Sequence, residues 1–221
     1  MKVKNLFGCG LSALGEKAEN KTHSCTVPGE QDPIDLEFRF HDCEPSMQNT
    51  LMGLSCEVLQ GLKRLSQETE RQREGESTED YEARMQGWSK RTARWFRHPK
   101  QKIQKEHFAT ILNRFDRIDT RMRNRRIAFK CVCCEDKTWR AYVKPGKSTI
   151  HICTNYPEPP DAALITHEMG HAYAKLKDYG FTDSENSGYT DEEGDEIELS
   201  TGQRVSNADT YGHYLEDYYI P

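Results

Sequence analysis

The chain has 221 residues and a formal net charge of −5, a size that suits one compact domain or one domain with a short arm. No apolar run approaches the roughly 18 residues of a membrane-spanning helix, which excludes a membrane span. Aromatic residues make up 10% of the chain, and several stretches are clearly periodic, which excludes wholesale disorder.

The first 42 residues look largely irregular. Their one regular feature is an alternation of apolar and polar residues over 34–40, which predicts a strand. The apolar run near the start is short and broken by glycines, and makes a poor signal peptide. We therefore divide the chain into an N-terminal arm or pro-like segment, 1–42, and a main domain, 43–221.

Three helices are predicted next. Apolar residues recur at helical spacing from Ser46 to about Leu65. A polar, acidic connection over 66–80 leads to a second helix over 79–96, which ends before Pro99. A third helix is predicted from about Lys100 to Met122.

Charge is segregated along the chain. Residues 84–130 hold 15 Lys and Arg against 3 Asp and Glu, whereas residues 178–218 hold 12 Asp and Glu against Arg204 alone. A basic segment can be a nucleic-acid-binding face, but here the basic residues are interleaved with apolar ones at the spacing of an amphipathic helix. We interpret them as a solvated helix face and expect no nucleic-acid partner.

The second half of the chain changes character. Two short β-like runs, Thr138–Val143 and Ser148–Cys153, flank the turn sequence Lys-Pro-Gly-Lys and predict a hairpin. A helix over 161–176, a long polar loop over 177–203 and a final helix over 206–218 follow. Helices, then a hairpin, then further helices predict an α+β fold.

The cysteines indicate an oxidising environment. There are eight, and only one CxxC pair, Cys131 and Cys134, so a zinc ribbon built from two such pairs is excluded. Disulfides are the better interpretation, with some buried free thiols as the alternative. We therefore expect a secreted protein.

The strongest motif is HExxH, which the predicted helix over 161–176 carries as His167-Glu168-Met169-Gly170-His171. Two histidines four residues apart lie on one helix face and can bind one zinc ion, Zn²⁺. Glu168 is placed to act as general base on a zinc-bound water, whose pKa the metal lowers to about 7. The alternative, two core histidines, is unfavourable because unpaired polar side chains are costly to bury.

A third zinc ligand is needed, because catalytic zinc sites usually have three protein ligands. No histidine lies between His171 and His213, so we expect the ligand in the acidic region that follows the motif. The candidates there are aspartates: Asp178, Asp183, Asp191 and Asp209.

These motifs resemble the aspzincins, the deuterolysin and peptidyl-Lys metalloendopeptidase family, which includes secreted fungal avirulence-type proteases. Lys177–Phe181 looks like the family's Gly-Thr-x-Asp-x-x-Tyr-Gly segment, and Asn207–Tyr211 matches its Asn-Ala-Asp-x-Tyr element. The resemblance is strong over about 148–218, weaker over 43–147 and absent over 1–42. It implies a zincin-like metallopeptidase domain over 43–221, with a helical N-terminal part, a small sheet, the HExxH helix and a C-terminal helix.

The resemblance also implies a ligand and an oxyanion donor. Asp178 corresponds to the family's third zinc ligand, with Asp183 as the alternative. The family tyrosine that is thought to steady the oxyanion is replaced by Phe181, which has no hydroxyl, so Tyr179 or Tyr189 are the alternative donors.

Three residues are assigned to substrate binding by the same resemblance: Asp209, Tyr211 and Phe181. Asp209 is implied to lie near the zinc or to line the pocket just past the scissile bond. A second interpretation is local, and compatible with the first. Ser206 followed three residues on by Asp209 is similar to a capping box at a helix start, and an acid in the first turn suits the helix dipole.

The predicted function is zinc-dependent hydrolysis of protein or peptide substrates by a monomer. A substrate strand is expected to pair with the hairpin edge at Thr149–Cys153. The acidic C-terminal region favours a modest preference for Lys or Arg after the scissile bond, modest because the peptidyl-Lys branch has a Glu where this chain has Gly212. The alternative is a zincin-fold effector or binding protein with little catalysis, which Phe181 favours and the intact Glu168 disfavours.

Overall fold

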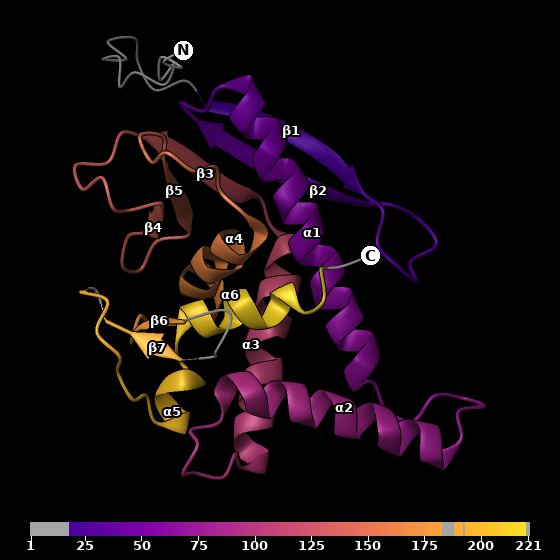
Figure 1. Cartoon of the computed structure of the whole chain (residues 1–221). Helices are drawn as coiled ribbons and strands as arrows, with labels where there is room; N and C mark the ends of the chain where they lie inside the picture. The colour runs from indigo at the N-terminus through magenta and orange to yellow at the C-terminus, as the bar shows by residue number, and fades with distance from the viewer. Residues whose placement is uncertain (1–17, 183–187, 192, 220–221) are drawn as a thin grey trace, which may run out of the picture.

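The computed structural model describes residues 18–182, 188–191 and 193–219 of the chain (Figure 1). The helices are α1 (Pro45–Thr69), α2 (Thr78–Phe96), α3 (Lys105–Asn124), α4 (Ala162–Met169), the π-helical turn η1 (Gly170–Ala174), α5 (Thr201–Arg204) and α6 (Ala208–Glu216). The strands are β1 (Ala18–Cys25), β2 (Ile34–His41), β3 (Ile127–Val132), β4 (Ala141–Val143), β5 (Thr149–Cys153), β6 (Phe181–Thr182) and β7 (Tyr189–Thr190). The predicted α+β class is confirmed.

The main sheet is mixed, with strand order β1-β2-β3-β5-β4. β1–β2 and β4–β5 are antiparallel, whereas β2–β3 and β3–β5 are parallel. Parallel neighbours need a long crossover, and α1 to α3 supply it between β2 and β3. The predicted hairpin is present, but the expectation that Thr149–Cys153 forms its open edge was wrong. β5 lies between β3 and β4, so the open edge on that side is β4.

Two strands of this sheet were not predicted. β1 was missed because it is an edge strand with mostly polar side chains, and only its last residue, Cys25, is buried. β3 does alternate, with Ile127, Phe129 and Cys131 buried, but it follows directly on the basic helix. Residues 18–41, expected to be mostly irregular, therefore contribute two of the five strands.

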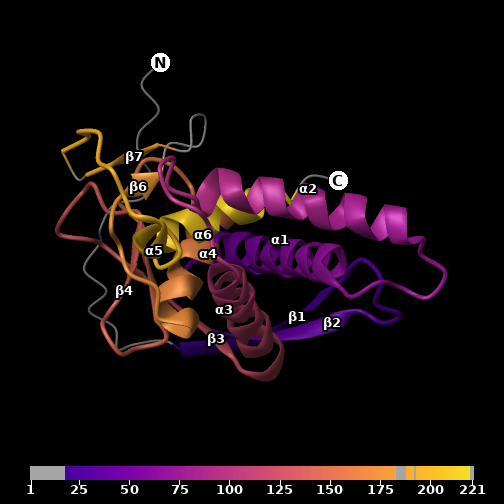
Figure 2. The same ribbon diagram turned by 90° about the horizontal axis from the view of Figure 1, so that it is seen from below.

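The helices pack on one face of the sheet (Figure 2). The inward side chains of β2 and β3 include three stacked rings, Phe38, Phe40 and Phe129, whose neighbouring centroids lie 5.7 to 6.4 Å apart. The apolar stripes of α1 and α3 cover them, since Leu51, Leu59 and other residues of α1 are fully buried. One core thus supports both the sheet and α4.

Disulfides join the sheet to its surroundings, as the cysteine count predicted. Cys25–Cys56 links β1 to α1, Cys43–Cys131 links the start of α1 to β3, and Cys134–Cys153 closes the segment between β3 and β5. Cys133 is disulfide-bonded too, and none of the described cysteines is free.

The basic stretch lies on α2 and α3 and is partly neutralised within the protein. Arg84 pairs with Glu76 at 2.8 Å and Arg91 with Glu68 at 2.6 Å. Among the described helices, none has both the length and the apolar character needed to cross a bilayer.

The C-terminal third is more structured than predicted. The helix expected over 161–176 changes at Gly170 into a π-helical turn, and the expected loop over 177–203 contains β6, β7 and α5. The last helix begins at Ala208 with Asn207 as its N-cap residue. The capping box predicted for Ser206 and Asp209 is therefore wrong, because the Asp209 carboxylate accepts the Thr182 backbone N–H instead. The other part of that prediction is confirmed, since Asp209 lies in the first turn of α6.

Candidate metal centre

Helix α4 carries His167 and Glu168 of the HExxH motif, and its first turn is capped. The Asp161 side chain accepts a hydrogen bond from the Leu164 backbone N–H at 2.8 Å, as an N-cap residue does. Arg140, just before β4, pairs with Asp161 at 2.7 Å. The helix that positions the histidines is thus tied to the edge of the sheet.

The second histidine, His171, lies in a π-helical turn, and the chain reverses where this turn ends. Gly170–Ala174 form a single π-helical turn, a feature often found at functional sites. Lys175 then adopts a left-handed conformation with φ 57°, and the Leu176 backbone N–H bonds to the Gly170 carbonyl at 3.1 Å. This reversal returns Asp178 to the face of the helix that carries the histidines.

Three ligand atoms meet there. The Nε2 atoms of His167 and His171 lie 3.0 Å apart, and the Asp178 Oδ1 lies 3.2 Å from the first and 3.0 Å from the second. The other ring nitrogen of His171, Nδ1, faces the Leu176 carbonyl oxygen at 2.9 Å. An Nδ1–H donated to that carbonyl leaves the Nε2 lone pair directed at the shared centre.

This triangle fits a zinc ion. Tetrahedral zinc with bonds of about 2.0 to 2.1 Å places neighbouring ligand atoms about 3.3 Å apart. Two imidazole nitrogens and one carboxylate oxygen are a common zinc donor set, and the fourth position then remains for water or substrate.

The charges at His167 and Asp178 also fit a metal site. Burial opposes a charge on His167, but the carboxylates of Asp178 and Asp209 raise its pKa to about 10. Burial also opposes a charge on Asp178, but hydrogen bonds with both histidines hold the pKa of its carboxyl well below the usual range. The site thus stabilises an added positive charge, which a proton or a metal ion can supply.

Glu168 lies beside the triangle and is only 3% exposed. Burial raises the pKa of its carboxyl, and the two neighbouring histidines offset part of that rise. Its Oε2 has no hydrogen-bond partner among the described residues. A buried carboxyl with a raised pKa and an unpaired oxygen is suited to accept and return a proton.

Asn207 fixes the loop that carries Asp178, a role that sequence reasoning did not assign. It is fully buried. Its Oδ1 accepts the Tyr179 backbone N–H at 2.8 Å and its Nδ2 donates to the Gly180 carbonyl at 2.9 Å. Backbone bonds from Lys177 to Ser206 and from Ala208 to Lys177 run alongside. The Asp178 loop is therefore attached to the start of α6.

Asp209 lies behind the first histidine. Its Oδ1 is 3.4 Å from the His167 Nδ1, and its Oδ2 accepts the Thr182 backbone N–H. His213, one turn further along α6, places its Nε2 3.7 Å from the same Oδ2. Both carboxylate oxygens of Asp209 are thus engaged inside the protein.

A family comparison identifies the class of protein. The family model described as lysine-specific metallo-endopeptidase, the aspzincins, matches residues 81–216, well over half of the chain. The chain belongs to the aspzincin family. Membership implies zinc-dependent metalloendopeptidase activity on peptide substrates. A comparison with curated proteins gives no match.

In this aspzincin, Phe181 and the two alternative oxyanion donors, Tyr179 and Tyr189, differ in their exposure. Phe181 in β6 is 47% exposed. Tyr189 is buried, and its hydroxyl donates to the Trp95 carbonyl at 2.9 Å, so this hydroxyl is engaged within the core. Tyr179 is partly exposed and directly follows Asp178. Asp183, the alternative ligand, lies outside the described residues.

Two positions of α6, Tyr211 and Gly212, lie within the packing of the core. Tyr211 is one of the residues predicted to bind substrate. Tyr211 is fully buried, packs against Phe96 and Phe115, and donates its hydroxyl to the Val205 carbonyl at 2.9 Å. Gly212 lies where α6 crosses α4, and a Cβ there would lie 2.7 Å from the Ala163 carbonyl oxygen. A glutamate at 212 is therefore incompatible with this helix packing.

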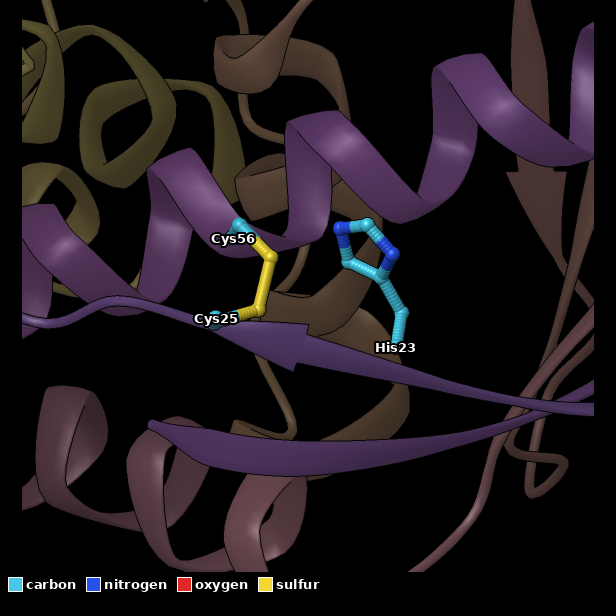
Figure 3. Close-up of side chains that lie close together, drawn as sticks. All are labelled: His23, Cys25 and Cys56. Carbon is cyan, nitrogen blue, oxygen red and sulfur yellow. A yellow bond between two sulfur atoms is a disulfide. The ribbon is translucent and has the colours of Figure 1, made fainter. Parts of the chain in front are cut away.

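A second group has ligand-like spacing among the described residues, formed by His23, Cys25 and Cys56. Figure 3 shows that the two sulfur atoms are bonded to each other, with the His23 ring beside them. Cysteine binds metal as the thiolate, which the disulfide removes. His167, His171 and Asp178 remain as the metal candidate.

Proposed function

We propose that this aspzincin is a zinc endopeptidase in which His167, His171 and Asp178 hold the metal and Glu168 is the general base. The observation that carries the proposal is the convergence of three ligand atoms within 3.0 to 3.2 Å of one another, next to a buried carboxyl. The arrangement corresponds to a zincin-like fold in which the HExxH helix supplies two ligands and the following reversal supplies the third.

The protein's own groups divide the chemistry between them. A zinc ion bound at the triangle supplies Lewis acidity to the scissile carbonyl and lowers the pKa of the attacking water. Glu168 takes a proton from that water and returns it to the leaving amine. Asp209 orients the His167 ring from behind and stabilises its Nδ1–H tautomer.

We propose β4 as the strand that binds substrate. It is the open edge of the sheet on the side that contacts α4. An extended peptide can pair with such an edge through backbone hydrogen bonds. The ion pair between Arg140 and Asp161 keeps this edge in register with the catalytic helix.

The proposed specificity is a modest preference for Lys or Arg after the scissile bond. Exposed acids between β7 and α5, such as Glu193 and Asp195, give this side of the molecule a negative field. The Asp209 carboxylate is occupied by His167 and Thr182, and Gly212 excludes a second carboxylate. A preference based on the field alone should weaken as salt is added.

The alternative function, an effector or binding protein with little catalysis, is favoured by one observation. Phe181 cannot donate a hydrogen bond to the oxyanion, and Tyr189 is turned into the core. We place the remaining donor at Tyr179.

We further propose that the protein acts outside the cell as a monomer. The disulfides fit an oxidising compartment. The division into a segment 1–42 and a peptidase domain 43–221 is likewise a proposal. It concerns function and not folding, because residues 18–41 form β1 and β2 of the same sheet and bury Phe38 and Phe40 in its core. Activity assays of chains shortened at residue 17 and at residue 42 test it.

Zinc analysis combined with cleavage profiling tests the main proposal. The reconstituted protein should hold one zinc and cut a peptide library, with Lys and Arg enriched after the cut at low salt and less enriched at high salt. Zinc binding without cleavage would support the effector alternative. An even or apolar preference at that position would refute the proposed specificity.

A further inference from the structure

His213 of α6 has no role in the proposed hydrolysis, yet its ring lies between charged groups. Its ring is partly buried, with 23% of the side chain exposed, and stacks on Trp95 of α2 with centroids 6.2 Å apart. Its Nδ1 lies 2.7 Å from the Glu216 Oε2, and its Nε2 lies 3.7 Å from the Asp209 Oδ2.

Both ring nitrogens therefore face carboxylates. An ionised carboxylate can accept hydrogen bonds but cannot donate them. A neutral imidazole carries one N–H and would direct a lone pair at one of the two acids. The doubly protonated ring donates a hydrogen bond to Glu216 and forms an ion pair with Asp209 at 3.7 Å. Its surroundings favour that form, since Asp161 at the start of α4 adds a third negative charge. Arg94 lies over the Trp95 ring, on which the His213 ring stacks.

We propose that His213 is a positioning residue for the metal centre. Placed between Glu216 and Asp209, it holds the Asp209 carboxylate turned towards the His167 Nδ1. The chain of contacts runs from Glu216 at the surface through His213 and Asp209 to His167. The inference rests on the proposed role of His167 as a zinc ligand.

The pKa of His213 supports this geometry. Burial lowers it, but Glu216 and Asp209 reverse the effect, so that it lies above the ordinary 6.5. The ring should therefore titrate above 6.5 in an NMR experiment. Glu216→Gln and Asp209→Asn should each lower that value, because each removes a negative charge.

Zinc affinity, measured by chelator competition at pH 7, tests the coupling to the metal. Replacing partners behind a ligand histidine weakens metal binding about 10- to 100-fold, and we expect His213→Leu to lie near the lower end. His213→Gln keeps an N–H donor and should recover part of the loss. His23→Leu, a partly buried histidine on β1, is the matched control and should bind zinc as the wild type does.

A double-mutant cycle separates positioning from packing. If His213 acts through Asp209, His213→Leu should weaken zinc binding in the wild type but have little further effect in Asp209→Asn. Loss of the Trp95 contact alone would instead give additive effects. In the cobalt-substituted protein, His213→Leu should likewise change the visible spectrum of the wild type but have little further effect on that of Asp209→Asn.

Additive losses, unchanged zinc affinity in His213→Leu, or titration of His213 below 6.5 would each overturn the inference. A wild-type protein that binds no zinc would refute the proposed function instead. The shifts of the His213 pKa in Asp209→Asn and Glu216→Gln would then still test the pairing itself.

Discussion

Asn207→Ala is expected to lower both the free energy of unfolding and the zinc affinity. The side chain is fully buried and satisfies the Tyr179 N–H at 2.8 Å and the Gly180 carbonyl at 2.9 Å. A hydrogen bond contributes about 1 kcal/mol net, and an unpaired buried group costs about 1 to 3 kcal/mol. Because both groups are only partly buried, we expect the free energy of unfolding to fall by about 2 to 3 kcal/mol.

Zinc affinity should fall as well, by about tenfold or more, because Asp178 precedes the released backbone directly. Asn155→Ala is the matched control. Asn155 holds the Cys134 backbone N–H and carbonyl, both at 2.9 Å, away from the metal centre. It should lose comparable stability in urea titrations but keep its zinc affinity in chelator competition. Equal zinc losses in the two variants would show that Asn207 only stabilises the fold.

The remaining predictions concern the proposed catalytic groups. Glu168→Gln should keep zinc but lose nearly all peptide hydrolysis, because an amide cannot take the proton; activity close to wild type would remove Glu168 from the mechanism. Asp178→Ala should weaken zinc binding far more than Asp183→Ala in chelator competition, and the reverse order would make Asp183 the ligand. Phe181→Tyr should raise kcat if the missing hydroxyl limits the rate; an unchanged kcat would indicate that another group stabilises the oxyanion. With zinc removed, the protein should lose stability as the pH rises from about 6.5 to 10, because the pKa of His167 is raised from 6.5 to about 10. The unfolded chain releases this proton near pH 6.5, whereas the folded protein holds it until about pH 10. Urea titrations at several pH values measure this, and a flat profile would contradict the pairing of His167 with Asp178.

Much of the catalytic helix could be predicted from the sequence. The spacing of His167 and His171 follows from helix geometry, and the hairpin that ends in Cys153 follows from alternation and a Pro-Gly turn. Local patterns carried these predictions because the physical cause lies within a few residues. The paired position of Asp178 is different, since it depends on a π-helical turn and a left-handed Lys175 that no local pattern indicated.

The features that were missed depend on distant contacts. β1 is polar because it is exposed at the sheet edge, so only its pairing with β2 reveals it as a strand. In the sequence, Asn207 looks like an ordinary helix start. Its hydrogen bonds to the Tyr179 N–H and the Gly180 carbonyl form only because α6 lies beside the loop. The need for glycine at position 212 is likewise visible only in the folded structure, where the Ala163 carbonyl leaves no room for a side chain.

The most direct test of the account is a crystal structure of the zinc-reconstituted protein with anomalous diffraction recorded at the zinc absorption edge. We predict one strong peak, bound by the Nε2 atoms of His167 and His171 and by the Asp178 carboxylate, with Glu168 beside it and Asp209 behind His167. No peak at this position, or a zinc ion held by other residues, would contradict the proposed metal centre and the mechanism built on it.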